Sequence, residues 1–332
     1  MSDRGWLIPS ALLTIALGAS ALAIMPNHSG VMPALLMLPL WLFVSAALAA
    51  ISGFLAMVFG GVKSPFAHIL QRIRHGWREH AMIGAGIALA GLNMIAFMWT
   101  KPLLNYFVPF WADPLLARLD RLLFLGHDPW TLLSWLNSMP MAIFYHRGWF
   151  ALMIVTLLVV LSRPPSPQKS AVMLSYFLLW SLVGPVIHVL MPAAGPVFFA
   201  RLGYGGEFAA LPLPDEMVRM TDYLWTYYSG SRFGPGSGIS AMPSLHIATT
   251  AWMIIAMQVL ARRWTWVVAV PGAVIFLLSI SLGWHYALDG IVGAAAAIGC
   301  YRLSLRAYEG RWPLPARLRP AASFNAQTAR FS

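Results

Sequence analysis

The sequence has few charged residues and almost no cysteine. Only 10% of its 332 residues are Asp, Glu, Lys or Arg, whereas about 25% is usual for a soluble domain. Cys300 is the single cysteine, which excludes a disulfide framework and a cysteine metal site within one chain. Acidic residues are scarcer than basic ones, and the net charge is +11. A basic balance can indicate nucleic-acid binding, but the distribution of these charges argues against it here.

What the sequence has in excess is apolar residues, which make up 59% of the chain. Several runs approach or exceed the roughly 20 apolar residues that cross a bilayer. Because a spanning backbone must satisfy its own hydrogen bonds, these runs predict helices. We predict an all-α polytopic membrane helix bundle with about eight spans. They are 7–25, 33–60, 81–99, 142–162, 170–191, 243–261, 265–283 and 286–303.

The whole chain, 1–332, is expected to form a single integral membrane domain. Its predicted parts are 1–100 with the N-terminal spans, 101–141 as an interfacial helical segment, 142–303 as the core bundle that holds the site, and 304–332 as a basic cytoplasmic tail. In the interfacial segment, Asp113 is expected to cap a helix that has Pro114 at its first position. The long segment 192–242 is rich in aromatic and charged residues, which favours a functional loop over a disordered one.

Most of the lysine and arginine residues fall on one side of the predicted bundle. That side comprises the loops 61–80 and 163–169, the pair Arg262 and Arg263, and the C-terminal tail. Most acidic residues fall on the opposite side. The positive-inside rule therefore predicts cytoplasmic termini, with the opposite side facing the periplasm or lumen. The net charge indicates topology and attraction to anionic lipid, so we expect the bilayer, and no nucleic acid, as a partner.

Two short polar strings begin hydrophobic segments near the C-terminal end. They are Pro243-Ser244-Leu245-His246 and Gly283-Trp284-His285-Tyr286-Ala287-Leu288-Asp289-Gly290. His246 and His285 each begin a descending span, so both are expected on the outer side at similar depth. Histidines near the ends of membrane helices often lie in the polar interface for structural reasons alone. Two of them at matched depth, with a carboxylate and a serine nearby, favour a functional site.

The residue types of these strings suit phosphoryl transfer through histidine. Asp289 lies four residues after His285, on the same helical face, where its carboxylate can orient one ring nitrogen and leave the other free to attack phosphorus. His246 suits the protonation of a leaving oxygen. Ser244 can donate its hydroxyl to a phosphate oxygen, and the starts of helices favour anions.

These motifs resemble the type 2 phosphatidic acid phosphatase superfamily, and within it the branch that contains inositol phosphorylceramide synthases. Pro192-Ala193-Ala194-Gly195-Pro196 is similar to the proline-rich first motif of that branch. The resemblance implies that His285 is the nucleophile of a phosphohistidine intermediate and that His246 protonates the leaving group. It also implies that Asp289 orients His285, that Ser244 binds the phosphate, and that no metal or cofactor is required.

Two cations of the superfamily's motifs are missing from their expected places. The first motif usually has a lysine followed by Arg-Pro, and the last usually has an arginine six residues before the histidine, where this chain has Ser279. A transferring phosphoryl group still needs its charge stabilised. The candidate phosphate-binding cations are Arg147, Arg201 and Arg232. Arg147 lies within a predicted span, where an ionisable residue suggests function, although pairing with an outer acidic residue or snorkelling is an equal alternative.

The sequence thus predicts an enzyme that transfers a phosphoryl or phospho-head group of a membrane lipid at the outer leaflet, without a metal. A lipid hydroxyl as acceptor would make it a phosphotransferase of the inositol phosphorylceramide synthase kind, and this is the favoured interpretation. Water as acceptor would make it a lipid phosphate phosphatase. A transporter with a polar path and an inactive relative with a scaffolding role are the competing hypotheses from different functional classes.

Overall fold

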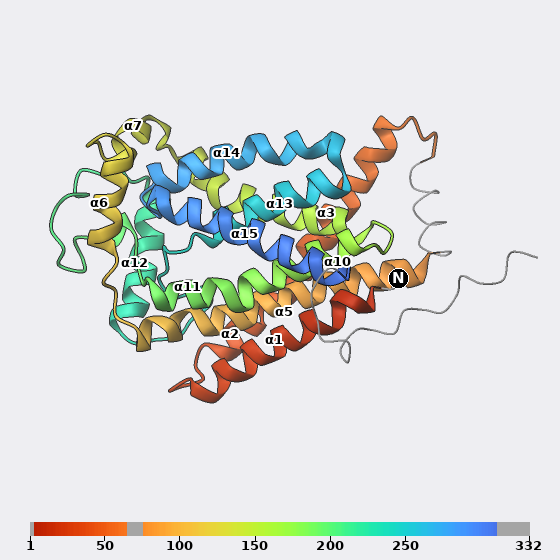
Figure 1. Cartoon of the computed structure of the whole chain (residues 1–332), viewed down its shortest axis with the longest axis horizontal. Coiled ribbons are helices and arrows are strands. Elements are labelled where there is room, and N and C mark those ends of the chain that lie inside the picture. Colours follow the sequence, from red (N-terminus) through yellow and green to blue (C-terminus); the bar gives the residue numbers. More distant parts are fainter. Residues whose placement is uncertain (1–2, 65–75, 311–332) are drawn as a thin grey trace, which may run out of the picture.

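The computed structural model describes residues 3–64 and 76–310. Within these ranges the chain forms helices and no strands. The long helices run side by side, while α6 (Asp113–Leu123), α7 (Pro129–Leu133) and α12 (Asp215–Ser229) gather at the end opposite the N-terminus (Figure 1). The predicted all-α helix bundle is therefore confirmed.

The described residues contain seven helical stretches that are long and apolar enough to cross a membrane. They are Gly5–Ile24, Val31–Phe59, Trp77–Phe107, Met139–Leu161, Pro167–Leu190, Arg262–Ser281 and Ala287–Tyr308. An eighth apolar helix, α13 (Leu245–Leu260), has 16 residues and is about 24 Å long at 1.5 Å per residue. Each of the eight predicted spans overlaps one of these helices, as expected of an integral multi-pass membrane protein.

The eight stretches are built from the following helices: α1 (Arg4–Ile24), α2 (Val31–Leu35) with α3 (Met37–Phe59), α5 (Trp77–Phe107), α8 (Met139–Ile143) with α9 (Trp149–Leu161), α10 (Pro167–Leu178) with α11 (Gly184–Leu190), α13, α14 (Thr265–Ser281) and α15 (Ala287–Tyr308).

Two of the spans contain a π-helical turn. The π-helical turns are Phe144–Gly148, between α8 and α9, and Leu179–Val183, between α10 and α11. Such turns often occur at functional sites.

Helix α13 is the centre of the bundle and packs against α9, α10, α14 and α15. Most of its residues are apolar and no face is strongly polar, as is typical of a helix packed among other helices. Trp252 in its middle is fully buried. The indole Nε1 of Trp252 donates a hydrogen bond to the carbonyl of Val172 at 2.7 Å, and the Tyr176 ring lies 5.1 Å away. The core thus fixes α13 against α10 and places the start of α13 at the end where α6 and α12 lie.

Helix α5 extends beyond the span predicted to end at residue 99. It continues to Phe107, with Pro102 inside the helix. Hydropathy falls at Thr100 and Lys101, and proline usually ends a helix, which is why the sequence predicted an earlier end. Lys101 therefore lies on the last turns of α5.

Asp113 plays a different part from the predicted helix cap. It is the first residue of α6, and Pro114 follows it in the first turn. The Asp113 side chain is fully buried, and the N-cap position is taken by Ala112. Its carboxylate instead accepts hydrogen bonds from the main-chain N–H groups of Ala194 and Gly195. The prediction of a cap was wrong because both oxygens of the Asp113 carboxylate bind N–H groups of a distant segment, those of Ala194 and Gly195.

Some of the basic positions used to predict the orientation, namely Arg72, Arg74 and the tail from residue 311, lie outside the described residues. The cytoplasmic location of the termini remains a prediction.

Candidate active site

The two motif histidines come together at one end of the bundle. Helix α14 runs back from the end of α13, so α13 and α15 begin at the same end of the bundle (Figure 1). His246 is the second residue of α13, and His285 lies two residues before α15. Their ring centroids are 6.3 Å apart, with an angle of 52° between the rings. Both rings are within reach of one phosphate group, because an attacking nitrogen needs about 3–3.5 Å to phosphorus and a proton donor needs about 2.8 Å to an oxygen.

A main-chain carbonyl determines the tautomer of His285. The ring nitrogen Nδ1 lies 2.9 Å from the carbonyl oxygen of Ala241. Because a carbonyl can only accept, Nδ1 carries the proton and Nε2 keeps its lone pair. The nearer oxygen of Asp289, Oδ2, is 3.6 Å from Nδ1, which is too long for a hydrogen bond. It accepts instead from the main-chain N–H of Tyr286 at 2.8 Å. Ala241, and not Asp289 alone, therefore orients the ring.

The protonation state of His285 follows from its surroundings. Burial lowers the pKa of His285 to about 3; the Ala241 carbonyl raises it, and the charges of Lys101 and His146 lower it. The ring is therefore neutral at pH 7. A neutral imidazole with a free Nε2 is the form that a nucleophilic histidine requires.

Aromatic rings surround His246 and fix its orientation. The Trp149 ring centroid lies 4.2 Å from that of His246, and the Tyr145 ring stacks on it at 5.1 Å. Trp149 also donates from Nε1 to the main-chain carbonyl of His246 at 3.0 Å. Both aromatic residues come from the π-helical turn and the start of α9. The start of α13 is thus anchored to a neighbouring span.

Ser244 connects the two motifs. It is the N-cap of α13, where Oγ accepts a hydrogen bond from the N–H of Ile247 at 3.3 Å. Its own N–H donates to the main-chain carbonyl of Asp289 at 3.0 Å. Within the described part of the chain the Ser244 hydroxyl donates to no acceptor, so its proton is available for donation. The starts of α13 and α15 are therefore held together directly by Ser244 and Asp289.

A relay of hydrogen bonds connects Asp113 with His285. The Asp113 oxygens hold the N–H groups of Ala194 and Gly195 at 2.9 and 2.8 Å. The preceding carbonyl, that of Ala193, accepts from the N–H of Ala241 at 2.8 Å. Ala241 in turn accepts from His285. The proline-rich segment 192–196 therefore supports the His285 ring through Ala241.

Asp120 lies on α6, seven residues after Asp113, and its side chain caps the start of a different helix, α15. Its two oxygens accept from the N–H groups of Ala287 at 2.6 Å and Leu288 at 3.1 Å. Sequence reasoning missed this role. The only available signal was the spacing of the two aspartates, which puts them on the same face of a helix.

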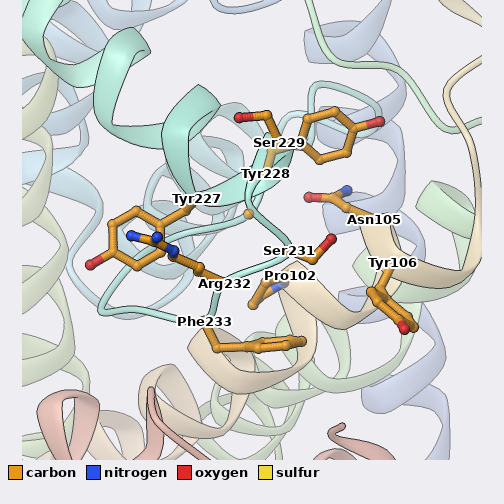
Figure 2. A pocket seen from close by; sticks show the side chains of 10 residues that line it. Pro102, Asn105, Tyr106, Tyr227, Tyr228, Ser229, Ser231, Arg232 and Phe233 are labelled. Carbon is orange, nitrogen blue, oxygen red and sulfur yellow. The ribbon is translucent and has the colours of Figure 1, made fainter. Parts of the chain in front are cut away.

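Two of the three predicted arginines pair with carboxylates of α12, and the third follows the end of α12. Arg147 forms an ion pair with Glu216 at 3.5 Å, and its side chain is 73% exposed. Arg201 pairs with Asp222. Arg232 lines a cavity of about 350 Å³. The cavity lies between the end of α5 and the end of α12, with Asn105 on one wall and Arg232 on the other (Figure 2).

Two further side chains near the histidines were not among the predicted site residues. His146, on the π-helical turn, has its ring 6.1 Å from that of His246 and 5.7 Å from that of Trp284. Its Nε2 is buried and has no hydrogen-bond partner among the described residues. The charge of Lys101, on α5, lowers the pKa of His285. Neither residue belongs to a motif, so spacing alone could not have identified them.

The fold and the paired histidines together define a membrane-embedded helix bundle suited to phosphoryl transfer. The chain belongs to the PAP2 superfamily, whose family model matches residues 114–303. That range includes α6 from Pro114 onward and extends into α15, and it contains His246 and His285. Neither the curated proteins nor the solved structures compared with the chain gave a match. Membership supports a phosphatase or phosphoryl-transfer activity and a core bundle of the phosphatidic acid phosphatase type.

Proposed function

We propose that the protein transfers a phosphoryl or phospho-head group of a membrane lipid through a phosphohistidine on His285, on the outer side of the membrane. The observation that carries this proposal is the hydrogen bond from Nδ1 of His285 to Ala241. It leaves Nε2 as a nucleophile beside His246, which serves proton transfer. The catalytic unit then comprises the predicted core, 142–303, together with α6.

The first half of the reaction forms the covalent intermediate. Nε2 of His285 attacks phosphorus, an N–P bond forms, and the P–O bond to the leaving alcohol breaks. His246, in its protonated form, gives its proton to the leaving oxygen. The His285 ring becomes cationic in this step. The Asp289 carboxylate, 3.6 Å from Nδ1, stabilises that charge, as an acid beside a catalytic histidine does.

The second half regenerates the enzyme. An acceptor hydroxyl gives its proton to His246, its oxygen forms a bond to phosphorus, and the N–P bond breaks. Ser244 donates its hydroxyl to a phosphate oxygen throughout. Arg232, Arg147 and Arg201 are the proposed cations for the rest of the head group as it approaches.

The acceptor is proposed to be a lipid hydroxyl, with water as the alternative. The resemblance of 192–196 to the first motif of inositol phosphorylceramide synthases supports this choice. Burial supports it too, because His285 is only 6% exposed and a screened intermediate is protected from hydrolysis. A transporter has less support, because the polar cluster lies at one end of the bundle.

The test uses purified protein in detergent with labelled lipid phosphates and phosphodiesters, with and without ceramide or diacylglycerol. A new labelled lipid supports transfer, and free phosphate supports hydrolysis. His285→Ala should abolish turnover and acid-labile labelling of the protein, while His28→Ala, a change at an exposed histidine, should leave both unchanged. Turnover by His285→Ala at the wild-type rate would refute the proposal. Activity in the presence of a chelator tests the expected independence from metal.

A further inference from the structure

His188 is a buried histidine that the proposed mechanism does not use. It lies on α11 and is 1% exposed. The ring of Phe110 packs against it edge to face, with the two ring centroids 6.2 Å apart. A polar ring in such a setting is costly unless its nitrogens form hydrogen bonds. The partners of its two nitrogens therefore indicate why a histidine occupies this position.

The partners of His188 lie on two other parts of this end of the bundle. Nδ1 lies 3.0 Å from Oγ of Ser240 and 3.3 Å from the carbonyl oxygen of Met242. Nε2 lies 3.3 Å from Nδ2 of Asn105, near the end of α5. One imidazole therefore connects α5 and α11 with the non-helical segment 239–242.

The orientation of the Asn105 amide determines which nitrogen of His188 carries the proton. Nδ2 of Asn105 donates to the carbonyl of Ile239 at 2.6 Å, and Oδ1 accepts from the N–H of Ile239 at 2.5 Å. This two-point pairing excludes a flipped amide, which would place donor against donor. Nδ2 thus faces His188, so Nε2 is the acceptor and Nδ1 is the donor. The Met242 carbonyl, which can only accept, requires the same tautomer.

Segment 239–242 contains the acceptor of the proposed nucleophile. The carbonyl of Ala241 accepts from Nδ1 of His285. The two residues that flank Ala241 are those that His188 binds. Because the segment forms no helix, side-chain contacts supply hydrogen bonds that regular structure would otherwise provide to its main chain. A shift of this segment would move the acceptor of His285 directly.

We propose that His188 is a positioning residue of the phosphoryl transfer. By donating from Nδ1 to residues 240 and 242, it fixes the carbonyl of Ala241 and, through that carbonyl, the orientation and tautomer of His285. Its partner Asn105 lies outside residues 114–303, the range that the family model matches, so part of this support comes from a helix before that range. The proposal rests on the proposed function of the histidine pair.

The experiment uses two amide substitutions that each keep one half of the imidazole. In asparagine the amide nitrogen is attached to Cγ, as Nδ1 is in histidine, so His188→Asn keeps a donor towards Ser240 and Met242. In glutamine the amide lies one atom further out, as Nε2 does, so His188→Gln keeps only a contact with Asn105. His188→Gln should lower kcat about 10- to 100-fold, since a small displacement of a reacting group has this effect. His188→Asn should keep most of the wild-type kcat, and KM should change little in both.

Melting temperatures separate positioning from a purely structural role. Asparagine is smaller than glutamine and leaves the larger cavity, so His188→Asn should melt at a lower temperature than His188→Gln. A purely structural histidine would make His188→Asn the more damaged variant in every assay, whereas positioning makes it the more active one. His80→Asn and His80→Gln are the matched controls, because His80 is exposed in the first turns of α5 and its Nδ1 also contacts a carbonyl, that of Gly76, at 2.7 Å. Both controls should keep the wild-type kcat.

A spectroscopic measurement reports on His285 without turnover. In protein with isotope-labelled histidine nitrogens, the magnetic resonance signals of His285 are those missing from His285→Ala. The wild type and His188→Asn should show the His285 proton on Nδ1. His188→Gln should show a mixture of both tautomers, because the Ala241 carbonyl is no longer held in place.

The outcomes distinguish this proposal from the proposed function. If the wild type is active and His285→Ala is inactive, but His188→Gln keeps kcat within about threefold of the wild type, the role of His188 is refuted and the function stands. An equal fall of kcat in both His188 variants also refutes it, because loss of the Nδ1 donor is then not the cause. If the wild type transfers no phosphoryl group, the proposed function fails, and an unchanged His285 tautomer in His188→Gln then refutes positioning as well.

A variant on the other side of the contact covers the case in which His188→Gln does not fold. Asn105→Asp keeps an oxygen for the N–H of Ile239 but removes the donor to Nε2 of His188 and to the Ile239 carbonyl. Its kcat should fall about tenfold, because segment 239–242 loses part of its support. A folded Asn105→Asp protein with the wild-type kcat would refute the proposal.

Discussion

Replacing Asp113 should reduce activity although Asp113 does not touch the histidine ring. The relay from Asp113 through residues 193–195 and Ala241 determines where Nδ1 of His285 finds its acceptor. Asp113→Ala removes the acceptor at the start of this relay. The loop is then free to move, and a displacement of about 1 Å at a reacting group can lower a rate about 100-fold.

The loss of stability can be worked out from the hydrogen bonds. Asp113→Ala leaves the buried N–H groups of Ala194 and Gly195 and the buried hydroxyl of Tyr286 without their acceptor, at a cost of about 1–3 kcal/mol each. The substitution also removes a carboxylate whose burial is unfavourable, since burial raises the pKa of Asp113 against the opposing effect of its hydrogen bonds. We therefore expect a net loss of about 2–4 kcal/mol. Asp113→Asn keeps one oxygen acceptor and should lose about half as much.

The assay combines thermal unfolding in detergent with lipid phosphate turnover. The melting temperature should fall in the order wild type, Asp113→Asn, Asp113→Ala, and kcat should fall in the same order with a smaller change in KM. Asp215→Asn, at an exposed position at the start of α12, is the matched control. If Asp113→Ala folds with an unchanged melting temperature, or if its kcat equals that of the wild type, the relay does not position His285.

Three further predictions concern the site and the topology. Gly195→Ala should destabilise the protein and lower kcat, because Gly195 has a φ of +101° and a Cβ there would collide with the carbonyl of Trp284; thermal unfolding and turnover check this. With a phosphodiester substrate of constant charge, kcat/KM should not fall with decreasing pH until about pH 4. The reason is that His285, with a pKa of about 3, binds a proton only as the pH falls towards that value. A fall in kcat/KM centred near pH 6.5 would contradict this prediction. In a Cys300→Ala background, a membrane-impermeant thiol reagent added to intact cells should label Thr131→Cys and spare Lys63→Cys, and the reverse pattern would invert the predicted orientation.

Hydropathy was sufficient for the fold because a membrane helix must be long and apolar. All eight predicted spans overlap helices of the structure. The end of α5 was misplaced because Lys101 and Pro102 interrupt the hydropathy, while Asn105 and its neighbours extend the helix through tertiary contacts. Helix ends that depend on distant partners cannot be read from local sequence.

The motif histidines could be paired from the sequence because counting spans places them at the same end. Their functional roles remain predictions. The support of His285 by Ala241 could not be predicted, because a main-chain carbonyl carries no side-chain signal. Asp113 and Asp120 resembled the solvated side of an amphipathic helix, and only the packing of α6 across the end of the bundle shows that they face inward. The arginine pairs depend on the position of α12, which lies within a long loop of the predicted topology.

The π-helical turn at Phe144–Gly148 gives this span one more residue than a regular α-helix of the same length would hold. Deleting one residue there would leave an unbroken helix across the bilayer. The side chains of the span before the deletion would rotate by about 100° about the helix axis relative to the side chains after it. This rotation would move His146 and Tyr145 away from His246. Relatives of different length at this point would therefore share the membrane topology yet differ in the rings that surround His246.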